Sequence, residues 1–200
     1  MPRATNERVM ALVRERGVLR PRDLSALGLD PNYLTRLERT GRLERIGRGL
    51  YVSADAAVDE HHTLAEVSKR APHGVVCLLS ALRFHEIGTQ NPYQIWLAID
   101  RDDRAPKEPR LPLRIVRFSG QAMRGGTEEH LIEGVPVRVY SPAKTVADCF
   151  KYRNKIGIDV ALEALREVRR ERRATMDEIW RYAQVDRVAN VMRPYLDSLA

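Results

Sequence analysis

Apolar side chains recur every three to four residues along two segments near the start of the chain, which is the spacing of one face of an α-helix. The first segment covers residues 6–16 and ends at Gly17, and the second begins at Pro21 and ends at Gly28. Proline suits a first helical position because its missing N–H would have no partner there, and glycine commonly ends a helix. The apolar positions of these two predicted helices are Val9, Leu12, Val13, Leu24 and Leu27.

A third helix is expected over residues 31–40, because Asp30 can accept a free backbone N–H of the first turn and Pro31 presets the helical φ. Leu34 and Leu37 fall on one side of this helix, and polar side chains gather on the other. The polar positions are Asn32, Thr35, Arg36 and Arg39, with Tyr33 at the boundary. The same pattern is typical of an ordinary solvated helix face, so the segment that follows decides its interpretation.

The period of the pattern changes directly after this helix. Residues 43–46 and 50–52 are expected to be strands, and the glycines of Gly47-Arg48-Gly49 allow the positive φ values of a tight hairpin turn. Three helices followed by a basic hairpin are typical of a winged helix-turn-helix, which places its third helix in the major groove of DNA. The expected DNA contacts are Asn32, Tyr33, Thr35, Arg36 and Arg39 of the helix and Arg45 and Arg48 of the hairpin.

The charge distribution supports this interpretation. Residues 1–53 hold eleven arginines and six acidic residues, a surplus of five, whereas the whole chain has a net charge of +7. Positive charge concentrated in one segment is the electrostatic signature of a polyanion partner, and such binding weakens as salt rises because counterions are released. Arginine reads guanine, asparagine reads adenine, and threonine offers a hydroxyl and a methyl group, so the third helix carries residue types suited to base readout.

The rest of the chain predicts a second domain. Residues 53–60 are small and acidic, so we place a boundary there, between a domain of residues 1–53 and one of residues 60–200. Strands are expected at residues 93–100, 113–118, 129–132 and 135–140, and helices at residues 60–70 and 77–86. The last sixty residues are helical, with Ser141 as the first cap. The predicted fold is α+β: an N-terminal winged helix-turn-helix followed by a mixed α+β domain that ends in a helical segment.

Composition predicts a folded protein without membrane contact. A chain of 200 residues that is 44% hydrophobic can bury one or two cores without disulfides or metals. Cys77 and Cys149 lie far apart in apolar surroundings, so both are expected to be reduced core residues. The first residues lack the apolar stretch of a secretion signal, and the longest apolar run, residues 75–82, is too short to span a bilayer. We therefore expect a cytoplasmic protein.

The sequence offers little support for catalysis. Asp100, Asp102, Asp103 and Lys107 could imitate a metal-dependent nuclease, but all four crowd one proline-rich loop, whereas such sites draw on adjacent strands. The five histidines do not have metal-site spacing, and no glycine-rich phosphate loop, nucleophile elbow or paired-cysteine zinc motif occurs. We therefore expect no enzyme activity, no cofactor and no metal site.

Several segments together resemble the AbiEi family of bacterial antitoxins, which belong to type IV toxin–antitoxin systems associated with abortive infection of phage. The resemblance covers nearly the whole chain, and the segments that carry it are residues 45–52, 76–82, 93–100 and 141–153, followed by Gly157 and residues 161–165. It implies an N-terminal domain that represses its own operon by binding repeats in promoter DNA. It also implies a C-terminal domain that neutralises a nucleotidyltransferase-like toxin, without a stable complex between the two proteins.

The residues that neutralise the toxin do not follow from the resemblance. Lys144, Lys151, Arg153 and Lys155 gather around one predicted helix end and are the candidate antitoxin surface, although positive charge there also suits the helix dipole. A second basic run, residues 166–173, is either a solvated helix face or a nucleic-acid contact. An alternative from another functional class is a stand-alone winged-helix transcription factor whose C-terminal domain senses a ligand or a protein partner.

Overall fold

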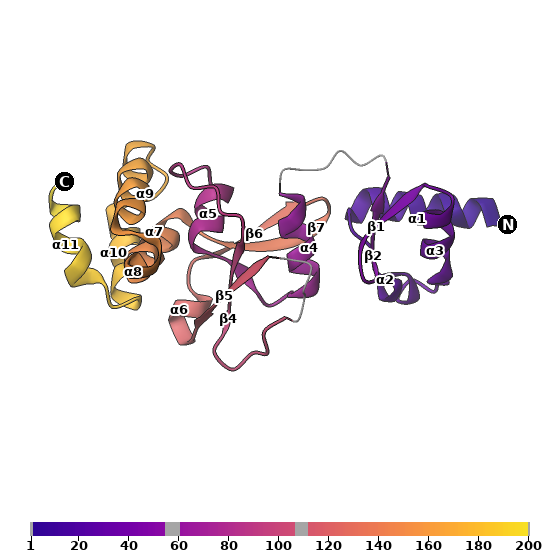
Figure 1. Ribbon diagram of the computed structural model, residues 1–200, viewed down its shortest axis with the longest axis horizontal. Coiled ribbons are helices and arrows are strands. Elements are labelled where there is room, and N and C mark those ends of the chain that lie inside the picture. Colours follow the sequence, from indigo (N-terminus) through magenta and orange to yellow (C-terminus); the bar gives the residue numbers. More distant parts are fainter. Residues whose placement is uncertain (1, 55–60, 107–111, 200) are drawn as a thin grey trace. The chain divides into compact units, whose positions relative to one another are not determined.

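The chain packs as two compact units in the computed structural model (Figure 1). The residues that the structure describes are 2–54, 61–106 and 112–199. The first unit comprises Met1–Pro72 with Leu131–Val137, and the second comprises His73–His130 with Arg138–Ala200.

This division differs from the boundary expected at residues 53–60, of which 55–60 lie outside the described residues. Packing assigns residues 61–72 and a short segment from much later in the chain to the first unit, because these segments contact the winged helix. Independent folding of residues 1–53 and 60–200 stays a prediction.

The first unit contains the winged helix. Its elements are α1 (Pro2–Arg16), α2 (Pro21–Ser25), α3 (Asn32–Arg39), β1 (Leu43–Gly47), β2 (Leu50–Ser53) and α4 (His62–Arg70). Asp30 Oδ1 accepts the N–H of Asn32 at 2.9 Å, as expected, although Pro31 is the cap of α3 rather than its first residue. The hairpin turn has two residues, since Gly47 pairs with Leu50, and Gly49 adopts the positive φ of 68° that such a turn requires.

The apolar sides of the three helices form one core with the hairpin, and Leu19 adds a strand-like bridge to Tyr51. The buried members of this core are Val9, Met10, Val13, Leu19, Leu24, Leu34, Leu37, Leu43 and Tyr51. Leu27 was expected among them, but it is 36% exposed. Because α2 ends at Ser25 and the chain turns there, Leu27 no longer follows the helical period.

The second unit contains most of a mixed five-stranded sheet with the order β5-β4-β3-β7-β6, of which Leu131–Val137, at the turn between β6 and β7, belong to the first unit. Its first elements are β3 (Val75–Val76), α5 (Leu78–Phe84), β4 (Ile95–Asp100), β5 (Leu113–Phe118), α6 (Gly120–Arg124), β6 (Thr127–Ile132) and β7 (Val135–Tyr140). Strand β4 runs parallel to β5, while β3 is antiparallel to β4 and parallel to β7. The four expected strands are present: β5 and β7 have the expected bounds, whereas β4 begins later and β6 begins earlier than expected. The elements β3 and α6 were not predicted, because two and five residues are too short to show a period.

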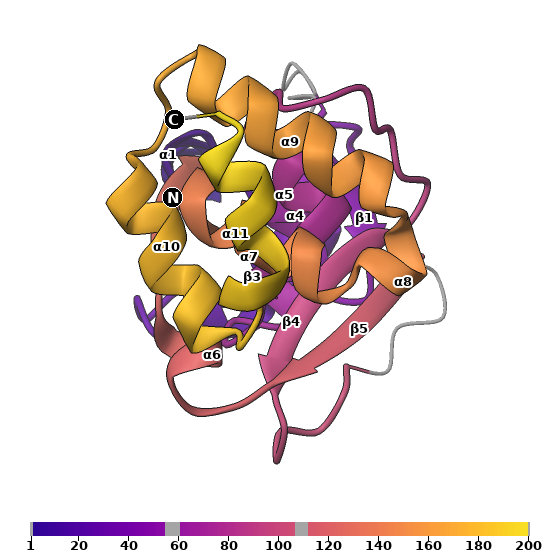
Figure 2. The same ribbon diagram turned by 90° about the vertical axis from the view of Figure 1, so that its left-hand side faces the viewer.

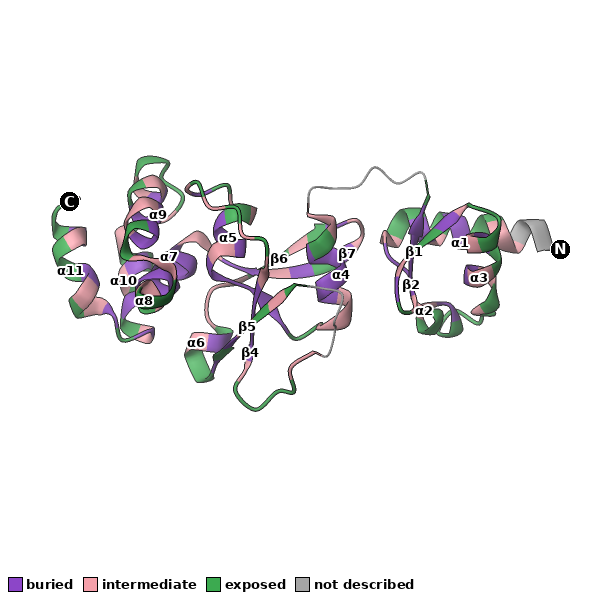
Figure 3. Cartoon of the chain, in the orientation of Figure 1, coloured by how far each residue is buried: buried purple, intermediate pink, exposed green. Residues whose placement is uncertain are grey.

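Helices complete the second unit (Figure 2). They are α7 (Pro142–Lys151), α8 (Arg153–Ile156), α9 (Ile158–Arg170), α10 (Met176–Val185) and α11 (Ala189–Asp197). Ser141 caps α7 as expected, because its hydroxyl accepts the N–H of Lys144 at 3.4 Å. Buried positions alternate with exposed ones along α9, α10 and α11 (Figure 3), and the apolar side of each helix packs into the core of the unit.

Both cysteines belong to this core. Cys77 and Cys149 are free thiols without exposed surface. Burial raises the pKa of each thiol, chiefly because a thiolate is poorly solvated inside the protein. This agrees with the expectation that both cysteines are reduced core residues.

Candidate nucleic-acid interface

Helix α3 is anchored by Leu34, which is fully buried, and by Leu37, which is 1% exposed. With these two side chains held in the core, the polar side of the helix faces outward. Asn32, Arg36 and Arg39 are exposed, and Tyr33 and Thr35 are half-buried beside them. Together with Asp30 these five residues line a cleft of about 450 Å³. The structure therefore gathers on one surface the five helix residues among the expected DNA contacts.

The hairpin presents its cations in different ways. Arg48 is exposed at the turn, whereas the guanidinium of Arg45 bends back and donates from Nε to the carbonyl of Gly47 at 3.2 Å. Behind the turn, Gly47 packs so closely against Arg70 of α4 that an added Cβ would overlap the guanidinium. Arg70 is in turn paired with Glu66 at 3.2 Å. Helix α4 thus supports the back of the hairpin, a contact that no local pattern in the sequence indicates.

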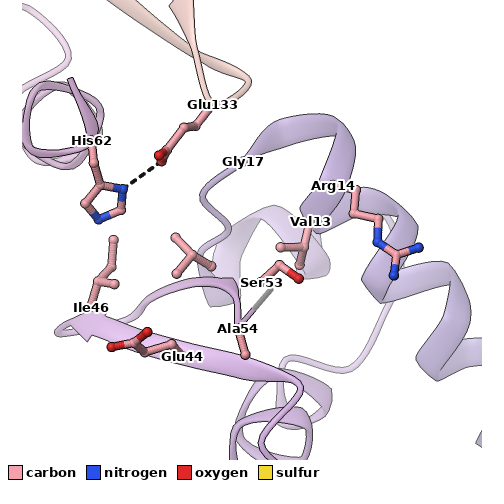
Figure 4. A pocket seen from close by; sticks show the side chains of 10 residues that line it. Val13, Arg14, Gly17, Glu44, Ile46, Ser53, Ala54, His62 and Glu133 are labelled. Carbon is pink, nitrogen blue, oxygen red and sulfur yellow. Dashed lines mark hydrogen bonds and ion pairs between the residues drawn. The ribbon is translucent and has the colours of Figure 1, made fainter. Parts of the chain in front are cut away.

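A cavity of about 420 Å³ lies within the first unit, behind the hairpin (Figure 4). Its lining residues are Val13, Arg14, Gly17, Glu44, Ile46, Val52, Ser53, Ala54, His62 and Glu133. Oε2 of Glu133 lies 2.8 Å from Nδ1 of His62 at its edge. Sequence reasoning missed this cavity, because Glu133 arrives from the turn between β6 and β7. The backbone of Glu133 lies so close to Gly17 that a Cβ added to Gly17 would overlap the Glu133 carbonyl.

The candidate antitoxin surface needs a correction at Lys144, which was expected at the surface but is fully buried. Its ammonium donates to Asp148 and lies 3.1 Å from Oδ2 of Asp186, in the core formed by α7 and α10. The ring centres of Phe118 and Tyr140 lie 4.8 and 4.9 Å away. Other segments of the chain cover the face of α7 on which Lys144 lies. The sequence around Lys144 does not reveal this burial, because one of its two carboxylate partners lies 42 positions away.

The other three candidates lie nearer to solvent. The side chain of Lys151 is 34% exposed and lies 3.4 Å from the carboxylate of Asp186. Arg153 donates to the carbonyl of Phe150 at 2.9 Å, which favours the alternative that positive charge here stabilises the end of a helix. Lys155 is exposed and lies over the ring of Tyr152.

The basic run at the end of α9 is largely engaged within the unit. Arg169 donates to the carbonyl of Leu199 at 2.6 Å, Arg170 pairs with Glu167 at 3.3 Å, and Arg173 donates to the carbonyl of His85. These contacts favour a structural role for the run over nucleic-acid contact.

The acidic loop after β4 is held together by hydrogen bonds from Arg117. Arg117 Nη1 donates to the backbone carbonyls of Asp100, Arg101 and Asp103 at 2.8–3.1 Å, which organises the loop after β4. Lys107 lies outside the described residues. Within residues 2–54, 61–106 and 112–199, three or more histidine, cysteine or acidic side chains do not gather as a metal site would require. In the same part of the chain, every helix is too short or too polar to cross a membrane.

Residues 7–54 match the family model described as "Transcriptional regulator, AbiEi antitoxin". No curated protein matches the chain. Among solved structures, the chain is similar to the crystal structure of the RV2827C protein from Mycobacterium tuberculosis, with a TM-score of 0.59 and 16% identity, over 89% of this chain and 70% of that chain. At this identity the similarity concerns the fold alone, and it agrees with the predicted α+β fold. The resemblance to the AbiEi antitoxin regulators is thus confirmed over residues 7–54, the segment that forms the winged helix.

Proposed function

We propose that the protein is a DNA-binding transcriptional repressor of its own operon and the antitoxin of a type IV toxin–antitoxin system. The repressor function rests on the outward surface of α3. Asn32, Arg36 and Arg39 are exposed there. On the opposite side, Leu34 and Leu37 are buried in the core and fix the orientation of the helix. A rigid helix that presents this set of donors suits the major groove, where arginine and asparagine pair bidentately with guanine and adenine.

In the proposed complex the two parts of the winged helix have different tasks. Arg36 and Arg39 read base edges, together with Asn32 and Thr35. Arg48 at the exposed hairpin turn binds a phosphate group and adds affinity without sequence preference. One winged helix contacts few base pairs, so we expect two copies to bind repeated half-sites in the promoter.

The test of repression is a gel-shift titration on the DNA upstream of the protein's own gene, at two salt concentrations and with unrelated competitor DNA. Saturable binding that survives competitor is the expected result. Binding that competitor abolishes would contradict specific autoregulation and leave a generic DNA-binding surface.

The antitoxin part of the proposal rests on the family match over residues 7–54 and on the resemblance of the remaining chain. We propose that neutralisation uses the second unit, with Lys151, Arg153 and Lys155 as the candidate surface. The experiment is co-expression with a neighbouring nucleotidyltransferase-like toxin, with cell growth as the readout. Lys155→Glu is expected to weaken rescue, whereas Arg36→Ala abolishes repression and leaves rescue intact. Equal rescue by both variants would contradict the proposed surface.

The cavity of about 420 Å³ behind the hairpin favours the alternative function, a regulator that senses a ligand, although it lies in the first unit rather than in the C-terminal domain. A small molecule held there would touch Ile46 and Val52 of the two hairpin strands and so reach the proposed DNA-binding surface. Screening small molecules for a rise in melting temperature that disappears in Val52→Trp would test this alternative.

A further inference from the structure

A cluster of cations gathers where α2 begins and α4 ends, around the single carboxylate of Asp23. Nζ of Lys69 lies 3.3 Å from Oδ2 of Asp23, and Nε of Arg22 lies 4.0 Å from Oδ1. The same Oδ2 also accepts the backbone N–H of Arg20 at 2.8 Å, which places Arg20 at this point as well. Asp23 therefore contacts the side-chain cations of Lys69 and Arg22 and the backbone of Arg20.

The charges in this cluster do not balance. Arg20, Arg22 and Lys69 bring three positive charges to one negative charge, while the nearby Arg70 is already paired with Glu66. Burial lowers the pKa of Arg20, and the positive charges of Arg22 and Arg70 lower it further despite Asp23. The pKa of Lys69 is also lowered, chiefly by burial, and the positive charges of Arg20 and Arg22 lower it further despite the opposing effect of Asp23. Half-buried cations that repel one another in this way are stabilised by a further anion.

The position of the cluster indicates which anion. Helix α2 is the helix before α3, and in a helix-turn-helix that helix crosses the DNA backbone while the next one enters the groove. The hairpin turn lies beside the start of α2, since a Cβ added to Gly49 would be 3.6 Å from Cδ of Pro21. Arg48, next to Gly49, is exposed at that turn. The cluster thus continues the surface on which the hairpin cation is expected to bind a phosphate.

We propose that Arg20, Arg22 and Lys69 form a phosphate-binding site for the DNA backbone, which α2 and α4 build together. This inference rests on the proposed repressor function and deepens it, because Lys69 comes from a helix outside the predicted domain of residues 1–53. The side chain of Arg22 is 70% exposed, so it contacts the phosphate directly in the proposed complex. The side chain of Lys69 is only 17% exposed and contributes positive charge beneath the surface. Contacts of this type carry no sequence information but contribute strongly to salt-dependent affinity.

The experiment measures the affinity of the full chain for a labelled duplex of its own upstream DNA at several salt concentrations. Arg22→Gln and Lys69→Gln are each expected to lower the affinity for specific and unrelated duplexes alike. Each is also expected to reduce the slope of log K against log salt by about 0.9, the value for one lost phosphate contact. Lys69→Arg keeps the charge and should keep the slope.

Arg193→Gln is the matched control, because it removes one exposed arginine of the second unit and should leave the slope unchanged. Since Lys69 is partly buried, the melting temperature of each variant is measured, and the exposed Arg22 provides a variant that folds. An unchanged slope for Arg22→Gln in a protein whose specificity still depends on Arg36 overturns the phosphate site and leaves the repressor function standing. A wild-type protein that binds neither duplex overturns both.

Discussion

The ammonium nitrogen of Lys144 lies 3.1 Å from Oδ2 of Asp186, and neither side chain has exposed surface. Asp148, one turn further along α7, completes the group and is equally buried. Burial disfavours the charged ammonium, but the two carboxylates outweigh this effect, so the pKa of Lys144 is raised. The cluster joins α7 to the end of α10 and is a structural element of the second unit.

The first prediction concerns this cluster. Lys144→Met is expected to lower the free energy of unfolding by about 3–5 kcal/mol, because it leaves buried carboxylates without their counterion. Lys151→Met, which removes a partly exposed partner of the same Asp186, is expected to cost less than about 1 kcal/mol. Urea denaturation of both variants measures the difference. Equal stability of the two variants would show that Lys144 is not the counterion of this cluster.

The second prediction concerns alkaline pH. Burial raises the pKa of the Cys77 thiol well above 9.0 and that of the Tyr152 hydroxyl from 10.0 to about 12. In the unfolded state these groups have their ordinary pKa values of 9.0 and 10.0. Below these values the folded and the unfolded state are both protonated, so burial of the groups costs no stability. At higher pH the unfolded state releases the protons and the folded state keeps them, which favours unfolding. Stability is therefore expected to fall as pH rises through 9 and 10.

The measurement is the urea midpoint as a function of pH. Cys149→Ala removes one of the buried thiols whose pKa is raised, so it should reduce the decline near pH 9. A midpoint that stays constant up to pH 10.5 in the wild-type protein would contradict the burial of these groups.

The third prediction separates base readout from phosphate binding. Arg36→Ala is expected to cost about 1–3 kcal/mol on the specific duplex and to relax the preference at one base pair. Arg48→Ala is expected to weaken binding to all duplexes alike. Competition titrations with single-base variants of the operator distinguish the two patterns, and the same uniform loss in both variants would refute the division of tasks.

The fourth prediction uses two glycines with similar backbone conformation. Gly17 and Gly28 have φ values of 64° and 67°, but a Cβ at Gly17 would overlap the carbonyl of Glu133, whereas nothing lies within 4 Å of a Cβ at Gly28. Gly28→Ala is expected to cost about 1–2 kcal/mol, the strain of a left-handed alanine. Gly17→Ala carries the same strain and also displaces the turn between β6 and β7. Thermal unfolding of the two variants isolates the contribution of that contact, and an equal loss would mean that the contact is dispensable.

Much of the winged helix and its candidate site could be predicted. Several of these features depend on residues within a few positions of each other: the hydrogen bond that Asp30 accepts from Asn32, the cap at Ser141, the positive φ at Gly49 and the polar side of α3. Local patterns of this kind are visible in a single sequence. The sheet strands were predicted as well, except for β3, whose two residues have no measurable period.

Most helices and strands, the hairpin turn and the outward residues of α3 follow from local patterns, because hydrophobic period, capping and φ requirements act within a few positions. Other features depend on contacts between segments that lie far apart along the chain: the burial of Lys144 with Asp186, the support of the hairpin by α4 and the contact of Glu133 with Gly17. Burial and ion pairing of this kind arise only when folding brings those segments together, so the spacing of residues within one segment does not encode them.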